Sequence, residues 1–208
     1  MLVTSDAATQ ERVYRAIKAT LVRGEFAAGA RLEISSLAKR YGASQTPVRE
    51  VLGRLVGEGL VEHREEGGYR FCLLDAERLR DLYFWNAQHL LAALHVVREP
   101  VVVRALEPLR TRTAAAPIDQ VALIAQIFQA IGDATGNAEF SERIRNANER
   151  LQGFRMAEIE LFADTTLETS RLLALGRFNV QKNVRRKIMY YHRRRIEHAA
   201  QIIAAITS

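Results

Sequence analysis

The stretch LAKRYGASQTPVREVL, residues 37–52, decides the fold. It predicts a short helix that ends at Gly42, followed at once by a second helix that begins at Ser44. Serine often caps the N-terminus of a helix, and Pro47 falls in the first turn, where a missing N–H does no harm. Two helices joined by so short a turn are typical of a helix-turn-helix.

A β-hairpin is predicted directly after the second helix. Residues 60–64 and 69–73 read as two short strands, and Glu65-Glu66-Gly67-Gly68 lies between them as the turn. Before the helix-turn-helix, residues 10–23 place apolar side chains on one helical stripe, and the helix before the turn is expected at about 35–41. Helix, turn, helix and hairpin in this order predict a winged helix-turn-helix.

From Asp75 onward the sequence shows helical periodicity and no strand pattern. Helices are expected at 76–97, 99–112, 117–134, 138–163, 166–176 and 179–206, with Asn137 as the N-cap of the fourth. Six helices with short joints predict an all-α bundle. The expected fold class is therefore mainly α, with a winged helix-turn-helix domain at 1–74 and an all-helical domain at 75–208.

The chain has 208 residues, a formal net charge of +6 and one cysteine, Cys72. Its first 75 residues are close to neutral by count, so a case for nucleic-acid binding rests on where single residues lie. One cysteine excludes an internal disulfide, which favours the cytoplasm, and we expect Cys72 to be a small buried hydrophobe. No apolar run approaches the length of a membrane span, so no membrane partner is expected.

The second helix of the motif has the side chains that a DNA recognition helix needs. Small polar residues open it, and Val48, Val51 and Leu52 supply an apolar back. Arg49 can pair bidentately with a guanine or hold a phosphate, and Gln45 suits the edge of an adenine. The expected contacts from this helix are Ser44, Gln45, Thr46 and Arg49, with the two hydroxyls suited to phosphates or thymine methyls.

Flanking residues complete the predicted DNA interface. Lys39 and Arg40 end the preceding helix and are expected to anchor phosphates. At the hairpin tip, glycines let the backbone approach a minor groove; the expected contacts there are Gly67, Gly68 and Arg64, or His63 in place of Arg64. The alternative is a helical hairpin with a solvated polar face. The agreement of turn, cap, apolar stripe and hairpin favours the DNA interface.

Over about 10–73 the sequence resembles the GntR family of bacterial transcription regulators. The resemblance is carried by Arg31-Leu32, Leu37-Ala38, the segment 42–52 and Glu58-Gly59-Leu60-Val61. It implies a regulator that binds double-stranded DNA. The chain departs from the family pattern at Gln45, where the family usually has arginine, at Ala28, where it usually has proline, and at Ser35, which replaces a basic contact. An altered operator half-site is therefore expected.

Residues 75–206 resemble the FCD type of effector domain of the FadR-like branch. The matching segments are Leu82-Tyr83, Phe128-Gln129, Ala134-Thr135-Gly136-Asn137 and Met189-Tyr190-Tyr191-His192. Many such domains bind a divalent metal through one Asp and three His. Those ligand positions fall here on Ala125, Gln129, a residue near Thr169, and His192. One histidine does not make a metal site, so the resemblance implies no metal and no cofactor here. The arginine that often anchors a carboxylate falls on Asn86.

His192 lies on the apolar stripe Ile188, His192, Ile196, Ala199 and Ile203, which directs it into the bundle. Two interpretations stay open: a hydrogen-bonded core histidine, or a member of an effector pocket for a small molecule such as an organic acid. The candidate pocket residues are Asn86, Gln129, Arg155, Glu158 and His192. The basic run between Lys182 and Arg195 is expected to be a solvated face. Tyr83, Phe84 and Trp85 are expected in the core or in a dimer contact.

The leading hypothesis is a cytoplasmic, homodimeric transcription regulator, expected to be a repressor. Two recognition helices would bind a palindromic operator, and an effector would change the affinity for DNA. Two alternatives stay open: a helical domain that serves only dimerisation, and a metal-dependent enzyme in that domain. The enzyme is disfavoured, since the five histidines are scattered and form no metal-binding motif. We therefore expect no enzyme activity and no catalytic residues.

Overall fold

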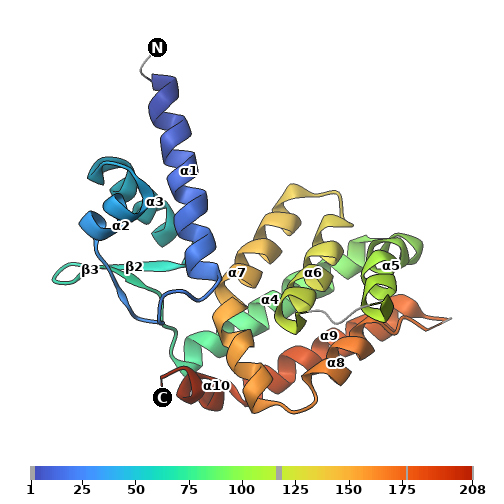
Figure 1. The fold of residues 1–208 in the computed structure, drawn as a ribbon. Helices are drawn as coiled ribbons and strands as arrows, with labels where there is room; N and C mark the ends of the chain where they lie inside the picture. The colour runs from blue at the N-terminus through green and yellow to red at the C-terminus, as the bar shows by residue number, and fades with distance from the viewer. Residues whose placement is uncertain (1–2, 116–118, 177, 208) are drawn as a thin grey trace. The chain divides into compact units, whose positions relative to one another are not determined.

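The computed structural model describes residues 3–115, 119–176 and 178–207. The chain divides into two compact units, 1–73 and 74–208, and each is described by itself (Figure 1). Unit 1 contains the helix-turn-helix and the hairpin, and unit 2 is helical throughout its described part. The predicted fold class is confirmed. None of the described helices combines the length and the apolar character that crossing a bilayer demands.

Unit 1 is built from three helices and a small antiparallel sheet. Its helices are α1 (Val3–Val22), α2 (Ile34–Tyr41) and α3 (Gln45–Gly57). Its strands are β1 (Arg31–Leu32), β2 (Val61–Arg64) and β3 (Gly68–Phe71), in the order β1-β3-β2. In the hairpin, His63 lies opposite Tyr69. The sequence did not predict β1, because two residues are too few to show an alternating pattern.

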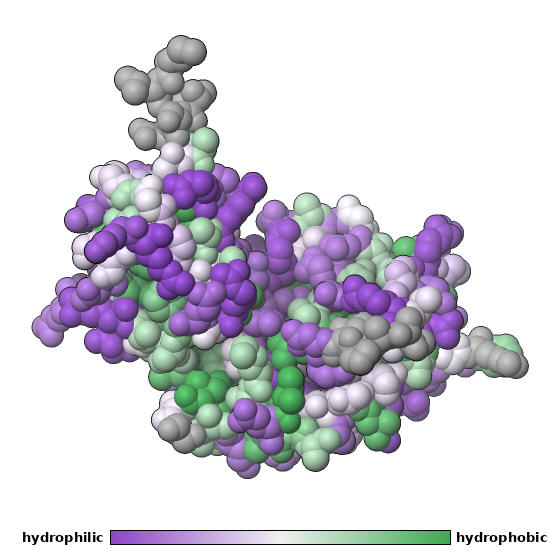
Figure 2. Space-filling model, in the orientation of Figure 1, coloured by the Kyte–Doolittle hydropathy of each residue, from purple (hydrophilic) through white to green (hydrophobic). Residues whose placement is uncertain are grey.

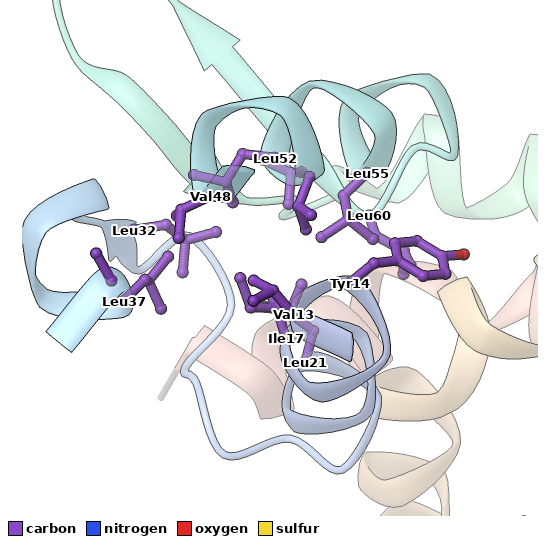
Figure 3. Packing of buried hydrophobic residues seen from close by; sticks show 13 residues of the cluster. Val13, Tyr14, Ile17, Leu21, Leu32, Leu37, Val48, Leu52, Leu55 and Leu60 are labelled. Atoms are coloured by element: carbon purple, nitrogen blue, oxygen red, sulfur yellow. The ribbon is translucent and has the colours of Figure 1, made fainter. Parts of the chain in front are cut away.

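The core of unit 1 lies between α1, the helix-turn-helix and the sheet (Figure 3). One face of α1 meets the inner face of α3 and the first residues of the hairpin. The fully buried apolar residues of this core include Val13, Ile17, Leu21, Leu32, Leu37, Val48, Val51, Leu52, Leu55 and Leu60. The apolar stripe of α3 is buried in this contact. The opposite face of α3 is therefore exposed to solvent or to a partner.

Gly42 makes the turn between α2 and α3 possible. Its backbone is left-handed, with φ 58° and ψ 52°, and its N–H donates to the carbonyl of Ala38. The next residue, Ala43, also donates its N–H to Ala38, at 3.0 Å. A residue with a Cβ adopts this conformation only with strain, so glycine ends α2 and redirects the chain into α3.

Two alanine substitutions in this motif should change stability in opposite directions. Gly42→Ala should lower the free energy of unfolding by about 1–2 kcal/mol, because a Cβ is disfavoured at positive φ even with open space around it. Gly53→Ala should raise it by about 0.5–1 kcal/mol, because Gly53 lies inside α3 with nothing near its Cβ position. Urea unfolding of both variants measures the difference. Equal shifts of the same sign would contradict the assigned backbone conformations.

Unit 2 contains seven helices in its described residues, where six were expected. They are α4 (Ala76–Val96), α5 (Glu99–Ala115), α6 (Gln120–Asp133), α7 (Ala138–Leu161), α8 (Thr165–Leu173), α9 (Val180–Glu197) and α10 (Ala199–Thr207). The expected helix at 179–206 divides at His198, whose φ of −105° and ψ of 15° leave the helical range. There the His198 ring bonds the carbonyl of Arg194 and packs edge-on against Phe162.

Helices α6 and α7 each begin after a residue whose side chain caps the helix by a hydrogen bond. Asn137 accepts the N–H of Glu139 at 2.9 Å, which confirms the predicted cap. Asp119 accepts the N–H of Val121, also at 2.9 Å, and α6 begins directly after it. The predicted start of this helix at 117 lies outside the described residues. Helix α6 packs against α7, while α4 lies along α9.

Some side chains lie elsewhere than predicted. Phe84 and Trp85 are 55% and 60% exposed, so only Tyr83 of the three aromatics lies in the core, and the predicted dimer contact stays open for the other two. In the predicted apolar stripe of α9 and α10, Ile196 and Ile203 are half-buried, while Arg195 and Ile202 are fully buried. Cys72 is half-buried rather than buried, and its Sγ lies 3.5 Å from Glu62 Oε1. The sulfur thus has a polar neighbour in the hairpin, whereas the sequence predicted purely apolar surroundings.

Candidate functional site

The outer face of α3 carries the four predicted contact residues together. Ser44, Gln45, Thr46 and Arg49 are all exposed, while Val48 and Leu52 on the same helix are buried. On the side of unit 1 seen in Figure 2, hydrophilic residues cover most of the surface around α2 and α3. The helix therefore presents short polar side chains and one guanidinium at its N-terminal end, the arrangement of a recognition helix.

Ser44 occupies the predicted N-cap position of α3, with an extended backbone of φ −77° and ψ 168°. Its position as the N-cap is confirmed, but its hydroxyl makes no capping hydrogen bond. The hydroxyl and the backbone N–H groups of the first turn are left as donors at the positive end of a helix. Donors in this position suit a phosphate oxygen.

The two cations predicted as phosphate anchors differ in their surroundings. Lys39 is exposed on the last turn of α2. Arg40 instead donates to Glu25 at 2.7 Å and lies over the rings of Phe26 and Tyr41. Arg40 thus ties α2 to the loop before β1. A phosphate would have to compete with the Glu25 carboxylate in a pair whose side chains are 48% and 37% exposed, so Arg40 stays a predicted phosphate anchor.

The hairpin tip is shaped by glycine as expected. Gly68 has φ 65°, in the left-handed region. Gly67 leaves space where a Cβ would touch the Arg64 and Arg70 side chains at ordinary contact distances. Arg64 is 64% exposed in its side chain and pairs with Glu62 at 3.3 Å. Such an exposed pair is weak, so the guanidinium can exchange its partner at low cost.

Helix α1 contacts both the turn before α3 and the far end of α3, a feature that the sequence did not reveal. At the turn, Arg12 donates to the carbonyls of Tyr41 at 2.9 Å and Gly42 at 3.2 Å. At the far end of α3, the Tyr14 hydroxyl donates to Glu58 at 2.7 Å, and Arg54 lies 3.4 Å over the Tyr14 ring. These contacts fix the tilt of α3 against the core. Because they join residues 29 to 44 positions apart, no local spacing indicates them.

The interior of unit 2 holds a network of buried charges centred on Glu158 and Arg195. Arg195 Nε donates to Glu158 at 2.8 Å, and its Nη2 donates to Glu168 at 2.7 Å. The hydroxyl of Tyr83 donates to Glu158 as well. Burial, followed by the charge of Glu158, raises the pKa of Tyr83 well above its usual value. The predicted solvated face is therefore wrong for Arg195, which is 2% exposed.

His192 is buried beside Asn86. Both residues belong to the effector pocket that the sequence predicted. The Nδ1 of His192 lies 2.7 Å from the carbonyl of Ile188, and its Nε2 lies 3.1 Å from Asn86 Nδ2. A carbonyl only accepts, so Nδ1 carries the proton and Nε2 accepts from the amide. The imidazole is thus neutral and hydrogen-bonded on both nitrogens, as expected for a core histidine.

This burial makes His192 a source of acid sensitivity. Burial is the main reason that the pKa of His192 falls from 6.5 to about 3. From about pH 6.5 down to about 3 the unfolded chain binds a proton that the folded chain does not, so stability falls as pH falls. The loss should approach about 1.4 kcal/mol per pH unit.

Substitution of His192 tests this dependence. His192→Gln should flatten the fall in the free energy of unfolding between pH 6.5 and 5, measured by urea denaturation. The control His63→Gln, at an exposed position of the hairpin, should keep the wild-type slope. A His192→Gln slope equal to that of the wild type would show that this histidine is not held neutral.

Arg155 is buried next to this network, and no carboxylate of the described residues pairs with it. Its Nη2 donates to Asn148 at 3.0 Å, and its guanidinium lies 5.4 Å from the centre of the Phe128 ring. Within the described part of the chain, its Nε and Nη1 have no hydrogen-bond partner, and neither has Asn86 Oδ1. The hollow beside Arg155, Thr169 and Arg195 measures about 10 Å³. That is about the space that one water molecule needs.

Gln129 does not join the other predicted pocket residues. Its Nε2 donates to Asp133 at 2.7 Å and to the Ser141 hydroxyl at 3.0 Å, between α6 and α7. The structure thus brings together Asn86, Arg155, Glu158 and His192 but not Gln129. Among the described residues, no group of three or more His, Cys, Asp or Glu is placed to hold a metal ion.

A larger hollow lies on the surface between α4 and α9, with a volume of about 940 Å³. Its lining includes one edge of His192, the aromatic side chains of Phe84 and Tyr190, and several cations of α9. The other predicted pocket residues do not line it.

Comparison with known proteins identifies unit 1. Residues 9–71 match the family described as bacterial regulatory proteins, gntR family. Unit 1 is therefore similar to the domain of that family, and the match is confined to this unit. The match covers α2, α3 and the hairpin, including the exposed face of α3.

Curated relatives of unit 1 carry names of transcription regulators. Over 87 residues the chain is 33% identical to the HTH-type transcriptional repressor GlaR of Escherichia coli, covering 41% of this chain and 40% of that protein. Over 72 residues it is 36% identical to the HTH-type transcriptional regulator BphR of Paraburkholderia xenovorans, covering 35% and 29%. The chain thus spans two fifths or less of the curated relatives it matches.

Solved structures resemble the chain over both units. A GntR transcriptional regulator from Rhodococcus sp. RHA1 aligns with 95% of this chain and 98% of its own, with a TM-score of 0.73 and 18% identity. Escherichia coli McbR/YncC aligns with 93% and 97%, with a TM-score of 0.65 and 20% identity. At these identities the likeness shows only that the fold is shared, a winged helix-turn-helix unit followed by a helical unit.

Proposed function

We propose that this protein is a DNA-binding transcription regulator that acts as a homodimer in the cytoplasm. The observation that carries the proposal is the outer face of α3, where Ser44, Gln45, Thr46 and Arg49 lie exposed on a helix of a unit that is similar to the gntR family. Two copies of α3 would enter successive major grooves of a short palindrome, and the hairpins would lie along the flanking minor grooves. The name of the relative GlaR supports a repressor.

Binding-site selection from a random duplex library tests this function. The full chain should enrich a short palindrome, and Gln45 should give it a half-site with an adenine at the position that this side chain meets. A Gln45→Arg variant should change the preferred base at that position towards guanine. Enrichment of no sequence, or of the same sequence by both proteins, would contradict the proposed recognition helix.

The helical unit would make the regulator responsive to a small organic acid. Support comes from two buried side chains of this unit. Arg155 has two donor nitrogens, and Asn86 one acceptor oxygen, that lack a hydrogen-bond partner among the described residues. The cavity of about 10 Å³ is too small for such a ligand without a shift of the surrounding helices. This size favours a second candidate, in which the unit serves dimerisation alone.

Thermal unfolding with small carboxylates distinguishes the two candidates. A bound acid should raise the melting temperature and change the affinity for the selected operator, and Arg155→Met should abolish both effects. Arg143→Met, at an exposed position of the same helix, is the control. If no carboxylate changes either quantity in the wild type, the dimerisation candidate stands and the effector proposal fails.

A further inference from the structure

One face of unit 2 exposes large apolar side chains on two neighbouring helices. On α4, Phe84 and Trp85 are 55% and 60% exposed; on α9, Met189 and Tyr190 are 57% and 51% exposed. Phe84, Met189 and Tyr190 border the groove of about 940 Å³ between the helices. We call this surface the α4–α9 face. A cluster of exposed apolar side chains rimmed by polar ones marks an interaction site.

The composition of the face is that of a protein–protein interface. Aromatic residues, methionine and arginine are enriched in interfaces, while Asp and Glu are depleted there. The lining of the groove holds three arginines and a lysine together with the aromatic residues and Met189, and it contains no Asp or Glu.

Charge changes along the length of the face, because α4 and α9 run in opposite directions. Gln181 at the start of α9 donates to the carbonyls of Leu94 and Val97 at the end of α4. Lys182, Arg185 and Arg186 therefore lie near the C-terminal end of α4 and form the cationic end.

At the opposite end, α4 exposes Glu77 and Asp81 and α9 exposes Glu197. We call this the acidic end. Arg78, Arg80 and Arg193 are exposed at this end as well, and Arg193 pairs with Glu197 at 3.7 Å. The acidic end is therefore close to neutral by count, whereas the cationic end carries three cations. Phe84, Met189 and Tyr190 lie between the two ends.

The difference in charge between the two ends favours one arrangement of two copies in a dimer. In a symmetric dimer the two-fold axis lies in the plane of the interface, and the same patch faces itself. An axis along the helices would put the two cationic ends against each other. An axis across the helices sets each α4 antiparallel to its copy, so that each cationic end meets an acidic end.

We propose that the α4–α9 face binds the α4–α9 face of a second copy of this chain, with the two α4 helices antiparallel. The inference rests on the homodimer of the proposed function and adds to it the surface and the orientation. The apolar centres cover each other, and Arg185 and Arg186 of one copy meet Glu77 and Asp81 of the other. A small anionic amphiphile in the groove is the competing occupant, but it would leave the acidic end without a role.

Charge reversal tests the pairing. Arg185→Glu with Arg186→Glu should raise the dimer dissociation constant on the order of a hundredfold, because acid then faces acid at both ends of the symmetric contact. Glu77→Arg with Asp81→Arg should do the same, and all four changes together should restore the wild-type constant. Sedimentation equilibrium measures it. Arg104→Glu with Arg171→Glu, exposed elsewhere on unit 2, is the control and should change nothing.

Cross-linking tests the orientation. In a Cys72→Ser background, Gln88→Cys should link to itself with a short bismaleimide, because the centre of α4 meets its own copy across the axis. Arg104→Cys on α5 should stay unlinked. A dimer that survives both double reversals, or a four-fold variant that stays dissociated, would overturn the inference, and so would a monomer stabilised by a small anion through Arg185.

The outcomes separate this inference from the proposed function. If the full chain is dimeric and selects a palindrome while the reversals change nothing, the regulator stands and the face is wrong. If the chain is monomeric at micromolar concentrations and still binds its selected site, the proposed dimer fails as well.

Discussion

Arg195→Ala is expected to lower the free energy of unfolding by about 3–5 kcal/mol, because it leaves two buried carboxylates without their shared cation. The guanidinium donates to Glu158 and Glu168 and lies 3.5 Å over the Tyr191 ring. Burial alone would lower the pKa of Arg195. The charges of Tyr191 and Glu158, together with Glu168, outweigh it and raise that pKa well above its usual value. Arg195 is therefore charged in the folded protein.

Urea unfolding at pH 7 measures this effect. The matched control is Arg143→Ala, since Arg143 has an exposed side chain and a loose pair with Glu139 at 3.7 Å. Pairs of that kind contribute little, so the control should unfold close to the wild type. Equal stability of Arg195→Ala and the control would show that the carboxylates do not depend on Arg195.

Arg49→Ala is expected to weaken binding to the selected operator by about 1–3 kcal/mol for each recognition helix, so by about 2–6 kcal/mol for a symmetric pair. Arg49 is exposed near the N-terminal end of α3, where side chains of a recognition helix meet base edges. Its loss should also reduce discrimination between the operator and altered duplexes, because a base contact carries sequence information.

Fluorescence anisotropy at one fixed salt concentration measures both quantities. Lys39→Ala is the informative comparison, because a phosphate anchor should weaken binding to all duplexes alike and reduce the salt dependence. If Arg49→Ala keeps the wild-type preference for the operator, Arg49 does not contact a base. If it behaves as Lys39→Ala does, its contact is to the phosphate backbone.

The helix-turn-helix was predictable because its determinants are local. Gly42, Ser44 and Pro47 follow one another within six positions, and each acts on the backbone beside it. The hairpin had the same advantage, since a double glycine between two short strand-like runs indicates its turn. The missing capping hydrogen bond of Ser44 was not predictable. A hydroxyl at this position can reach the first turn or leave it free, and sequence does not decide which.

The interior of the helical unit was only partly predictable. Helical spacing placed His192 inside the bundle, and the structure confirms its burial. The same spacing did not separate Arg195 from its basic neighbours, because a run of cations is usually a solvated face. What buries Arg195 is the presence of Glu158 and Glu168 on two other helices. A pairing between distant helices leaves no trace in local periodicity.

Tertiary contacts also explain what sequence reasoning did not reveal in unit 1. Arg12 binds the carbonyls at the end of α2 from another helix, so only the fold reveals it as a positioning residue for the turn. Arg40 was predicted to face phosphates, yet Glu25 holds it in the folded chain. In both cases the residue type was compatible with several partners. The geometry of α1 and of the loop before β1 selected one.

A chemical nuclease attached to the recognition helix tests the central claim most directly. In a Cys72→Ser background, Thr46→Cys carries a cleaving reagent on the outer face of α3, and Arg143→Cys on α7 is the control. With the selected operator, the Thr46→Cys protein should cut at two symmetric clusters, each centred in a half-site, while the control leaves no localised cleavage. Uniform cutting from Thr46→Cys, or localised cutting only from the control, would contradict a recognition helix that lies in the major groove.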